Sequence, residues 1–301
     1  MTYHNPVLLN ECIQGLSVKP GGIYVDVTFG GGGHSRSILS KLNGGKLFAF
    51  DQDESANVND LNQPGFKLIN ANFRHLKNFL KIEQVTKIDG LLADLGVSSY
   101  QFDVATRGFS TRFDGQLDMR MNVNSNLSAK DIVNDYSAED LANLFYKYGE
   151  LNNSRRIAYK IKEAREVSII NTTAELRNVI SDLVSENHRN RFLSRVFQAI
   201  RIEVNDEISA LEEMLLSAVD LLNPNGRLVV LSYHSLEDRL VKNLMKRGNF
   251  SGKIKKDFFG NPTKILKEIN SKVIVASESE IKENSRARSA RLRIAEKIND
   301  N

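Results

Sequence analysis

Asp26-Val27-Thr28-Phe29-Gly30-Gly31-Gly32-Gly33-His34 is the stretch that decides the fold. It ends a short apolar run at residues 23–27 and precedes a helical pattern at residues 35–42, which the Asn43-Gly44-Gly45 segment stops. Glycines between a buried strand and a helix let the backbone turn sharply beside a ligand, while the helix points its first amides at that ligand. The stretch therefore predicts a ligand-binding turn, with a purely structural turn as the alternative.

Further apolar runs have the length and composition of buried strands. Residues 46–51 end in Asp51 and residues 88–94 end in Asp94, with another run at residues 66–71 between them. Strands of this kind, separated by helical stretches, are typical of a parallel sheet covered on both faces. The pattern resumes at residues 227–231, after the turn Asn223-Pro224-Asn225-Gly226 and before a helix at residues 236–245, with weaker strand candidates at residues 264–269 and 290–295. The sequence predicts an α/β fold with a doubly wound, mostly parallel sheet.

The middle of the chain follows a different pattern. Residues 102–122 are rich in Gly, Asp and Arg and have no periodicity, whereas residues 128–205 are helical in pattern. Capping-box spacing opens three of the helical segments: Ser128 with Asp131, Ser137 with Asp140, and Thr172 with Glu175. We predict an inserted helical substrate-recognition domain at 104–205, within a cofactor-binding α/β domain formed by 1–103 and 206–301.

Composition narrows the class of protein. The 301 residues are 41% hydrophobic and 26% charged, with a net charge of +4. No apolar run approaches the roughly 18 residues of a membrane span, and residues 1–6 lack the regions of a signal peptide. Cys12, the single cysteine, has no disulfide partner and no neighbours at metal-ligand spacing. We expect a cytoplasmic protein without a membrane partner, and we predict no metal site.

The residues around the glycines narrow the choice of ligand. Ser35 stands where a dinucleotide site needs its third glycine, and no Gly-Lys-Ser/Thr follows for a phosphate loop. Asp26, two residues before Thr28, suits a cofactor with a cationic amino-acid end, as in S-adenosylmethionine. Asp51 could accept the ribose hydroxyls of either cofactor class, or could be a strand-end cap or ion-pair partner.

Two further positions fit an adenosine pocket. Phe73 follows the third strand and could pack on an adenine ring or simply lie in the core. Asp94 ends the fourth strand at the carboxyl edge, where open α/β sheets bind their ligands.

The sequence resembles the RsmH (MraW) family of bacterial ribosomal RNA methyltransferases. The resemblance runs nearly from end to end and rests on ordered blocks at residues 4–11, 28–35, 94–99, 107–110, 114–121, 197–202, 234–239 and 286–289. The block at residues 28–35 reads Thr-Phe-Gly-x-Gly-Gly-His-Ser, and the block at residues 234–239 reads His-Ser-Leu-Glu-Asp-Arg.

This resemblance implies a class I S-adenosylmethionine-dependent methyltransferase that modifies the exocyclic amine (N4) of a cytidine in the decoding region of small-subunit ribosomal RNA. The family's cofactor positions carry over onto Gly32, Gly33, His34, Asp51, Phe73, Asp94 and Gln101. Two departures bear on this. Tyr100 replaces the proline that is usual before the glutamine, and residues 191–195 differ from many relatives at a helix start.

Cytosine's amine is a weak nucleophile, so catalysis must orient it and accept hydrogen bonds from its N–H groups. We predict Asp94 as the catalytic acceptor, with a backbone carbonyl of the following loop as the alternative. Asp118-Met119-Arg120-Met121 could line the target pocket or form an internal Asp118–Arg120 network. Beyond the fifth strand, His234 could face the same edge, while Ser235 has the spacing of an N-cap, with Asp238 completing its capping box.

Clustered arginines predict contacts with RNA, either naked ribosomal RNA or the assembled small subunit. They lie at residues 286–293 and, in the insertion, at Arg155, Arg156, Arg189 and Arg191. A solvated charged face is the simpler interpretation of such runs. Two other functions stay open, a methyltransferase for another substrate and an RNA-binding assembly factor, and so does a homodimer.

Overall fold

A computed structural model describes residues 6–254, 256 and 264–299. His4, part of the first family block, lies outside the described residues. The chain divides into two units: unit 1 extends to Gly96 and resumes at Ile208, and unit 2 comprises Val97–Glu207. The predicted boundary 103/104 lies seven residues after the first division, and the predicted boundary 205/206 lies two residues before the second.

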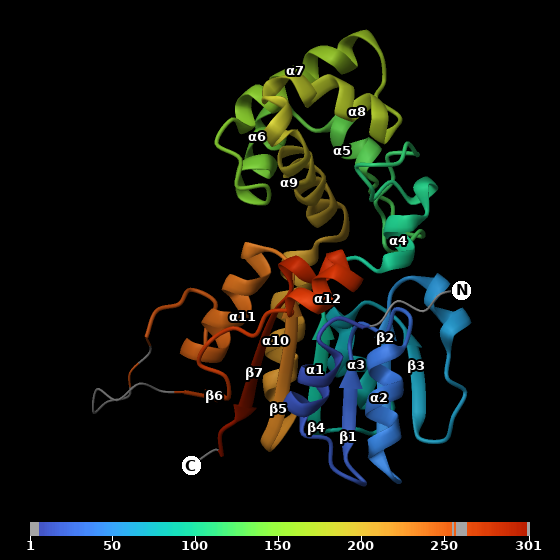
Figure 1. Cartoon of the computed structure of the whole chain (residues 1–301), viewed down its shortest axis with the longest axis vertical. Helices are drawn as coiled ribbons and strands as arrows, with labels where there is room; N and C mark the ends of the chain where they lie inside the picture. The colour runs from blue at the N-terminus through green and yellow to red at the C-terminus, as the bar shows by residue number, and fades with distance from the viewer. Residues whose placement is uncertain (1–5, 255, 257–263, 300–301) are drawn as a thin grey trace. The chain divides into compact units, whose positions relative to one another are not determined.

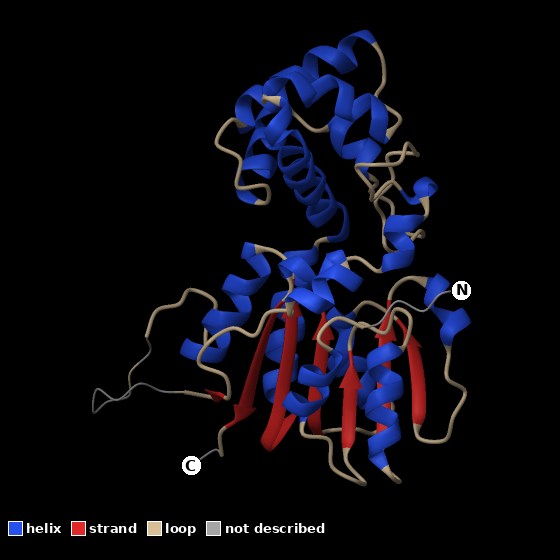
Figure 2. Ribbon diagram, viewed as in Figure 1, coloured by secondary structure: helices blue, strands red, loops and turns tan. Residues whose placement is uncertain are grey.

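Unit 1 is built on one sheet of seven strands in the order β3-β2-β1-β4-β5-β7-β6 (Figure 2). Neighbouring strands are parallel except at β7, which pairs antiparallel with β5 and β6. The bounds are β1 Ile23–Asp26, β2 Lys46–Asp51, β3 Phe66–Asn70, β4 Ile88–Asp94, β5 Leu222–Ser232, β6 Leu266–Glu268 and β7 Arg291–Lys297. The strand order leaves β1 and β4 in the centre, so the chain winds outward in both directions from them. The predicted α/β fold is confirmed.

Helices cover both faces of this sheet (Figure 1). One face packs on α3 (Leu76–Ile82), α10 (Glu207–Leu221) and α11 (Ser235–Arg247), and the other packs on α1 (Leu9–Leu16) and α2 (Gly33–Leu42). The shorter helices of unit 1 are η1 Glu54–Asn59, η2 Phe73–His75, α12 Glu278–Glu283 and η5 Ser285–Ser289.

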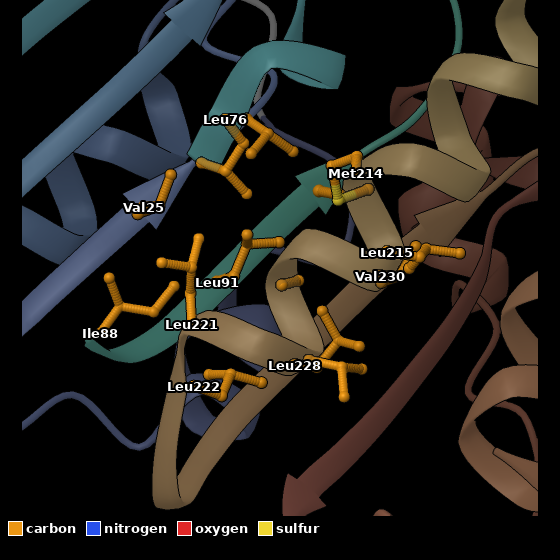
Figure 3. Packing of buried hydrophobic residues seen from close by; sticks show 14 of the residues in the cluster. Val25, Leu76, Ile88, Leu91, Met214, Leu215, Leu221, Leu222, Leu228 and Val230 are labelled. Atoms are coloured by element: carbon orange, nitrogen blue, oxygen red, sulfur yellow. The ribbon is translucent and has the colours of Figure 1, made fainter. Parts of the chain in front are cut away.

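The larger apolar core lies between the sheet and α10. Leu91 of β4 and Val230 of β5 face Met214 and Leu215 of α10, and all four are fully buried (Figure 3). Truncating one such leucine to alanine typically costs about 2–5 kcal/mol of stability. This packing fixes the strand ends that carry the polar residues described below.

The fifth strand is longer than predicted. β5 begins at Leu222, which pairs with Ile88 before a register shift, so the Asn223-Pro224-Asn225-Gly226 turn is an irregularity within an extended segment. Asn225 adopts a φ of 64°, in the left-handed region that asparagine tolerates. The two weaker strand candidates are confirmed as β6 and β7.

Unit 2 is helical and has its own apolar core. Its helices are α4 Ser99–Asp103, η3 Ala105–Arg107, α5 Ala129–Asp135, α6 Ala138–Lys147, α7 Ser154–Val167, α8 Thr173–Ile180, η4 Ser181–Leu183 and α9 Glu186–Asn205. The core joins Phe109, Leu117, Met119 and Met121 of the irregular segment to these helices. Ser128, Ser137 and Thr172 cap α5, α6 and α8, as predicted. None of the helices in the described residues has the length and apolar composition of a membrane span.

Candidate functional site at the carboxyl edge of the sheet

The acids that end β1, β2 and β4 lie at one edge of unit 1. Asp26 pairs with Ala49 and Leu92 across the parallel ladder, which brings the carboxyl ends of these strands together. This is the edge where open α/β sheets bind ligands. Each acid has different partners there, and these partners separate structural roles from candidate binding roles.

Asp26 anchors the glycine turn. Its Oδ1 accepts a hydrogen bond from the Thr28 amide at 3.1 Å, and its Oδ2 accepts one from Ser35 Oγ at 2.7 Å. The residue is only 1% exposed, and its burial raises the pKa of the carboxyl group. Asp26 therefore has a structural role in the turn, and its predicted contact with the cationic end of a cofactor stays untested. Ser35 replaces the dinucleotide glycine and serves as one of these donors.

The glycine turn leaves open space beside an uncapped helix. Among the residues that the structure describes, a Cβ atom added to Gly30 or Gly31 would meet no atom within 4 Å. Gly32 has a φ of 73°, and a Cβ there would lie 2.9 Å from the Phe29 ring, so glycine is required. No side chain caps the first turn of α2, which starts at Gly33. The amides at this helix start can therefore serve an anionic group of a ligand.

Asp51 is held by backbone amides at the end of β2. Its Oδ2 accepts from the Gly30 amide at 2.8 Å and its Oδ1 from the Asp53 amide at 2.9 Å. These bonds use two of about four lone-pair sites, so both oxygens can still accept hydroxyl groups. Burial raises the pKa of Asp51 to about 6. Asp51 caps the strand end and the turn while keeping the acceptor capacity that a ribose would use.

Asp94 is positioned by a residue whose role the sequence analysis missed. The Tyr233 hydroxyl donates to Asp94 Oδ1 at 2.7 Å, and the Asp94 amide donates to Thr28 Oγ1 at 2.6 Å. Burial raises the pKa of Asp94, although His34 and the Tyr233 hydrogen bond act in the opposite direction. Tyr233 directly follows β5. This position, one residue beyond a strand end at the carboxyl edge, could have marked it as a candidate site residue.

His34 faces the second oxygen of Asp94. The His34 Nε2 atom lies 3.2 Å from the carbonyl oxygen of Val7, so this nitrogen carries the proton. The His34 Nδ1 atom lies 3.8 Å from Asp94 Oδ2, which is too long for a direct hydrogen bond. Asp94 Oδ2 therefore keeps lone pairs that can accept from an N–H donor of a ligand.

The remaining predicted cofactor residues lie outside this group of contacts. Phe73 is partly buried against the main core, so it has at least the simpler of its two predicted roles. Gln101 belongs to unit 2, where it is 4% exposed and completes a capping box with Ser98 at the start of α4. A cofactor contact by either residue stays a prediction.

The predicted N-cap of α11 is wrong. His234 is the N-cap, and its Nδ1 and the Glu237 carboxylate form the capping box, while Ser235 is the first helical residue. The ring of His234 is largely buried, 3.1 Å from Glu237 Oε1. His234 therefore has a structural role at this helix start, and its predicted contact with substrate stays untested.

The arginines at residues 286–293 do not form one solvent-facing cluster. Asp238, predicted to cap α11, instead accepts hydrogen bonds from Arg293 at 2.7 Å and from Arg291 at 3.2 Å. The Arg293 side chain is only 14% exposed and forms an ion pair with Asp238, and its predicted RNA contact stays untested. Arg288 is exposed, and Arg291 keeps half of its side-chain surface exposed.

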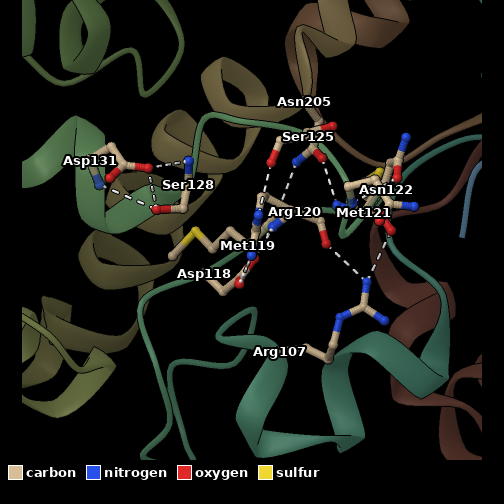
Figure 4. Close-up of polar contacts among 11 residues, drawn as sticks. Arg107, Asp118, Met119, Arg120, Met121, Asn122, Ser125, Ser128, Asp131 and Asn205 are labelled. Atoms are coloured by element: carbon tan, nitrogen blue, oxygen red, sulfur yellow. Dashed lines mark hydrogen bonds and ion pairs between the residues drawn. The ribbon is translucent and has the colours of Figure 1, made fainter.

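In unit 2 the segment around Asp118 forms an internal network (Figure 4). Arg120 donates to both carboxylate oxygens of Asp118, and its remaining Nη1 donates to the carbonyl of Ser125. Met119 and Met121 are buried in the helical core. The network alternative is thus the one that the structure shows. Of the predicted RNA contacts in this unit, Arg155, Arg156 and Arg191 are exposed and Arg189 is partly buried.

Comparison with known proteins agrees with the predicted family resemblance. The family model of the MraW methylase family matches residues 1–298. A ribosomal RNA small subunit methyltransferase H from Bacteroides thetaiotaomicron is 55% identical over 298 residues, which are 99% of this chain and 98% of the relative. A protein of the same name from Flavobacterium johnsoniae is 54% identical and covers 99% of both chains. Among solved structures, an rRNA methylase from Streptococcus thermophilus is 11% identical, with a TM-score of 0.45 and 99% coverage of both chains.

The family match spans nearly the whole chain, and the identity to the two curated relatives is 54% or more along their full length. Both findings confirm the resemblance seen in the ordered sequence blocks, and with it the enzyme class and the methyl donor. The chain belongs to the MraW methylase family and is an S-adenosylmethionine-dependent methyltransferase.

Proposed function

We propose that this protein methylates the exocyclic N4 amine of a cytidine in the decoding region of small-subunit (16S) ribosomal RNA. The observation that carries the proposal is the 54–55% identity, over nearly the whole chain, to relatives named ribosomal RNA small subunit methyltransferase H. The choice of a cytidine N4 comes from the family resemblance of the sequence blocks. The geometry of the carboxyl edge supports it through the placement of acceptors for amine N–H groups.

The carboxyl edge fits S-adenosylmethionine. Its methionine carboxylate suits the uncapped amides at the start of α2, beside the open space at Gly30 and Gly31. Asp51 retains lone pairs for the ribose hydroxyls, and Phe73 is the candidate for the adenine. When bound, the cofactor supplies an electrophilic methyl group on a sulfonium. Gly32, Gly33, His34 and Gln101 complete the proposed set of cofactor residues.

Asp94 is the proposed acceptor for the amine. The Tyr233 hydroxyl occupies Oδ1, which leaves Oδ2 facing the His34 Nδ1 atom at 3.8 Å. An N–H group bonded to Oδ2 would be held in one orientation, and the carboxylate would offset positive charge that develops on the nitrogen during transfer. The amine's surplus proton would leave through the same oxygen or to water. Because Oδ1 already accepts the Tyr233 hydrogen bond, we assign this task to Oδ2.

The helical unit is the proposed substrate-recognition domain. On α7, Arg155 and Arg156 are exposed, and Tyr159 of the same helix is 60% exposed. Exposed arginines together with an aromatic ring suit phosphate contacts and base stacking on single-stranded RNA. The target base must leave its stack to reach a buried methyl donor. We also expect the protein to act in the cytoplasm, where ribosomal RNA is found. A homodimer stays a prediction, which light scattering can test.

The decisive experiment is methyl transfer from labelled S-adenosylmethionine to small subunits, purified small-subunit RNA and total protein, followed by nucleoside mass spectrometry. We expect N4-methylcytidine in the RNA of subunits or in purified RNA. Label in protein alone would point to another substrate. Binding of RNA without any transfer would point to an assembly factor, and either result would overturn the proposal.

A further inference from the structure

The charged side chains that α11 exposes are all cations. Arg239, Lys242 and Lys246 are all exposed, and their spacing of three and four residues places them on one side of the helix. Both acids of the helix are buried: Glu237 is 4% exposed and Asp238 is 6% exposed. The exposed face of α11 therefore carries no carboxylate of its own.

Two cations elsewhere in unit 1 form ion pairs. Arg74 lies 3.0 Å from Glu213 of α10, and Lys77 of α3 lies 3.0 Å from Asp220 of the same helix. For Lys242 and Lys246, by contrast, no side-chain hydrogen bond or ion pair is present among the described residues. Like charges three or four residues apart on a helix cost a few tenths of a kcal/mol. An anionic partner would relieve this repulsion.

The cationic face begins beside the candidate site. α11 starts two residues after Tyr233, whose hydroxyl bonds Asp94, so its first turn lies at the carboxyl edge of the sheet. Arg291 of neighbouring β7 extends the face: one hydrogen bond ties it to Asp238, and 51% of its side chain is exposed. Figure 1 shows α11 in orange beside β7. The four cations form what we call the α11 stripe: Arg239, Lys242, Lys246 and Arg291.

We propose that the α11 stripe binds the phosphate backbone of the RNA substrate and leads the strand to Asp94. This inference rests on the proposed function and adds a second RNA-facing surface, on the catalytic unit. An RNA backbone fits better than an acidic protein, because no large apolar side chain is exposed on α11, and protein interfaces need an apolar centre. Phosphate binding needs only positioned cations and releases counterions when they meet the strand.

The test compares two double variants in the full-length protein. Lys242→Ala with Lys246→Ala removes two charges from the stripe. Lys41→Ala with Lys46→Ala removes two exposed charges at the end of α2 and the start of β2, at the opposite edge of the sheet. The probe is a fluorescein-labelled fragment of small-subunit RNA containing the decoding region, titrated at several salt concentrations. Calorimetry with S-adenosylmethionine reports separately on the cofactor site.

For the stripe variant we expect the slope of log affinity against log salt to shrink by about 1.4, since each contact with a single strand contributes about 0.7. Affinity near 0.2 M salt should fall on the order of tenfold. Cofactor affinity, and all properties of the control variant, should match the parent protein. Equal RNA binding by the two double variants would overturn the inference and leave the proposed function intact. Loss of binding to a poly-glutamate peptide with unchanged RNA binding would overturn it in favour of a protein partner. A parent protein that neither binds nor methylates RNA would overturn both.

Discussion

The carboxyl edge of unit 1 and the Asp118 loop of unit 2 both contain partly buried carboxylates, but these carboxylates have opposite kinds of partner. In the loop, one arginine bonds both oxygens of Asp118, and the remaining donor of that arginine meets a backbone carbonyl. At the edge, Asp51 is held by backbone amides and Asp94 by a tyrosine hydroxyl, and no arginine or lysine within the described part of the chain is bonded to either.

The pKa values follow this difference. Burial alone would raise the pKa of Asp118, but the hydrogen bonds and charge of Arg120 outweigh it, and the pKa is lowered. The pKa of Asp51 rises to about 6, and that of Asp94 is also raised, in both cases chiefly by burial. A carboxylate neutralised by its own cation has little left to offer a ligand. Desolvated carboxylates with neutral donors are typical of functional sites.

The largest effect should follow a change at Asp94. Asp94→Asn removes the charge that faces the reacting amine, and we expect methyl transfer to fall by about 10²–10⁴-fold. Single-turnover transfer of labelled methyl groups measures it. The matched control is Asp89→Asn in the same strand, where the side chain bonds the Ile23 amide near the opposite edge. Full transfer by the Asp94 variant would show that a backbone carbonyl, and not this carboxylate, is the acceptor.

The loop should respond in stability instead. Asp118→Ala leaves Arg120, whose side chain is 26% exposed, without its carboxylate. We expect the free energy of unfolding to fall by about 2 kcal/mol, since the arginine keeps the cost of its burial but loses the compensating bonds. Denaturant titration of Asp118→Ala, Arg120→Ala and the double variant gives the coupling energy between the two side chains. Unchanged stability together with weakened cofactor binding would mean that the loop serves the site directly.

Asp51 should make cofactor binding depend on pH. Its pKa of about 6 means that the free protein takes up a proton as the pH falls through 6, and the protonated group is a poorer acceptor for ribose hydroxyls. Affinity for S-adenosylmethionine should therefore be about tenfold weaker one pH unit below this pKa. Calorimetry between pH 5 and 8 measures this change in affinity, because that range extends from below to above the pKa of Asp51.

The control for that experiment is Asp51→Asn, which should bind weakly with little pH dependence. The raised pKa of Asp51 also affects stability. As the pH rises from the ordinary pKa of an aspartate toward 6, the free energy of unfolding should fall, because the unfolded chain releases this proton first. The asparagine variant has no carboxyl group to titrate at this position, so its melting temperature should change less with pH than that of the parent protein. A variant that binds weakly but keeps the full pH dependence would assign the titration to another group.

Sequence patterns predicted the features that depend on residues close together in the chain, namely strand ends and helix caps. Strand ends gave Asp51 and Asp94 because buried parallel strands are continuous apolar runs, and the acid marks where burial stops. Capping-box spacing located three helix starts in unit 2, because the donor and the acceptor of a cap lie only three residues apart in the sequence.

Contacts between distant segments were not predictable in this way. Tyr233 bonds Asp94 across 139 residues, and no local pattern announces such a pair. At α11 the local rule favoured Ser235 over His234, because serine is the better cap in general. Asp238 is instead held by Arg291 and Arg293 of β7, more than fifty residues away, and Glu237 is the acid left to cap the helix.

Tyr233→Phe should have the smallest effect on methyl transfer, and it tests directly whether the Tyr233 hydroxyl sets the pKa of Asp94. Removing the hydroxyl takes a hydrogen bond from the ionised form of Asp94, so the pKa of Asp94 should rise further. Transfer that needs the ionised carboxylate is lost as the pH falls, and the acid limb of its pH profile should move upward by about one unit. Tyr24→Phe removes a buried hydroxyl bonded to the Lys19 amide, elsewhere in the same unit, and should lower stability without moving the profile. If both variants had the parent profile, Tyr233 would only fill space behind Asp94, and the protonation of Asp94 would depend on burial and His34 alone.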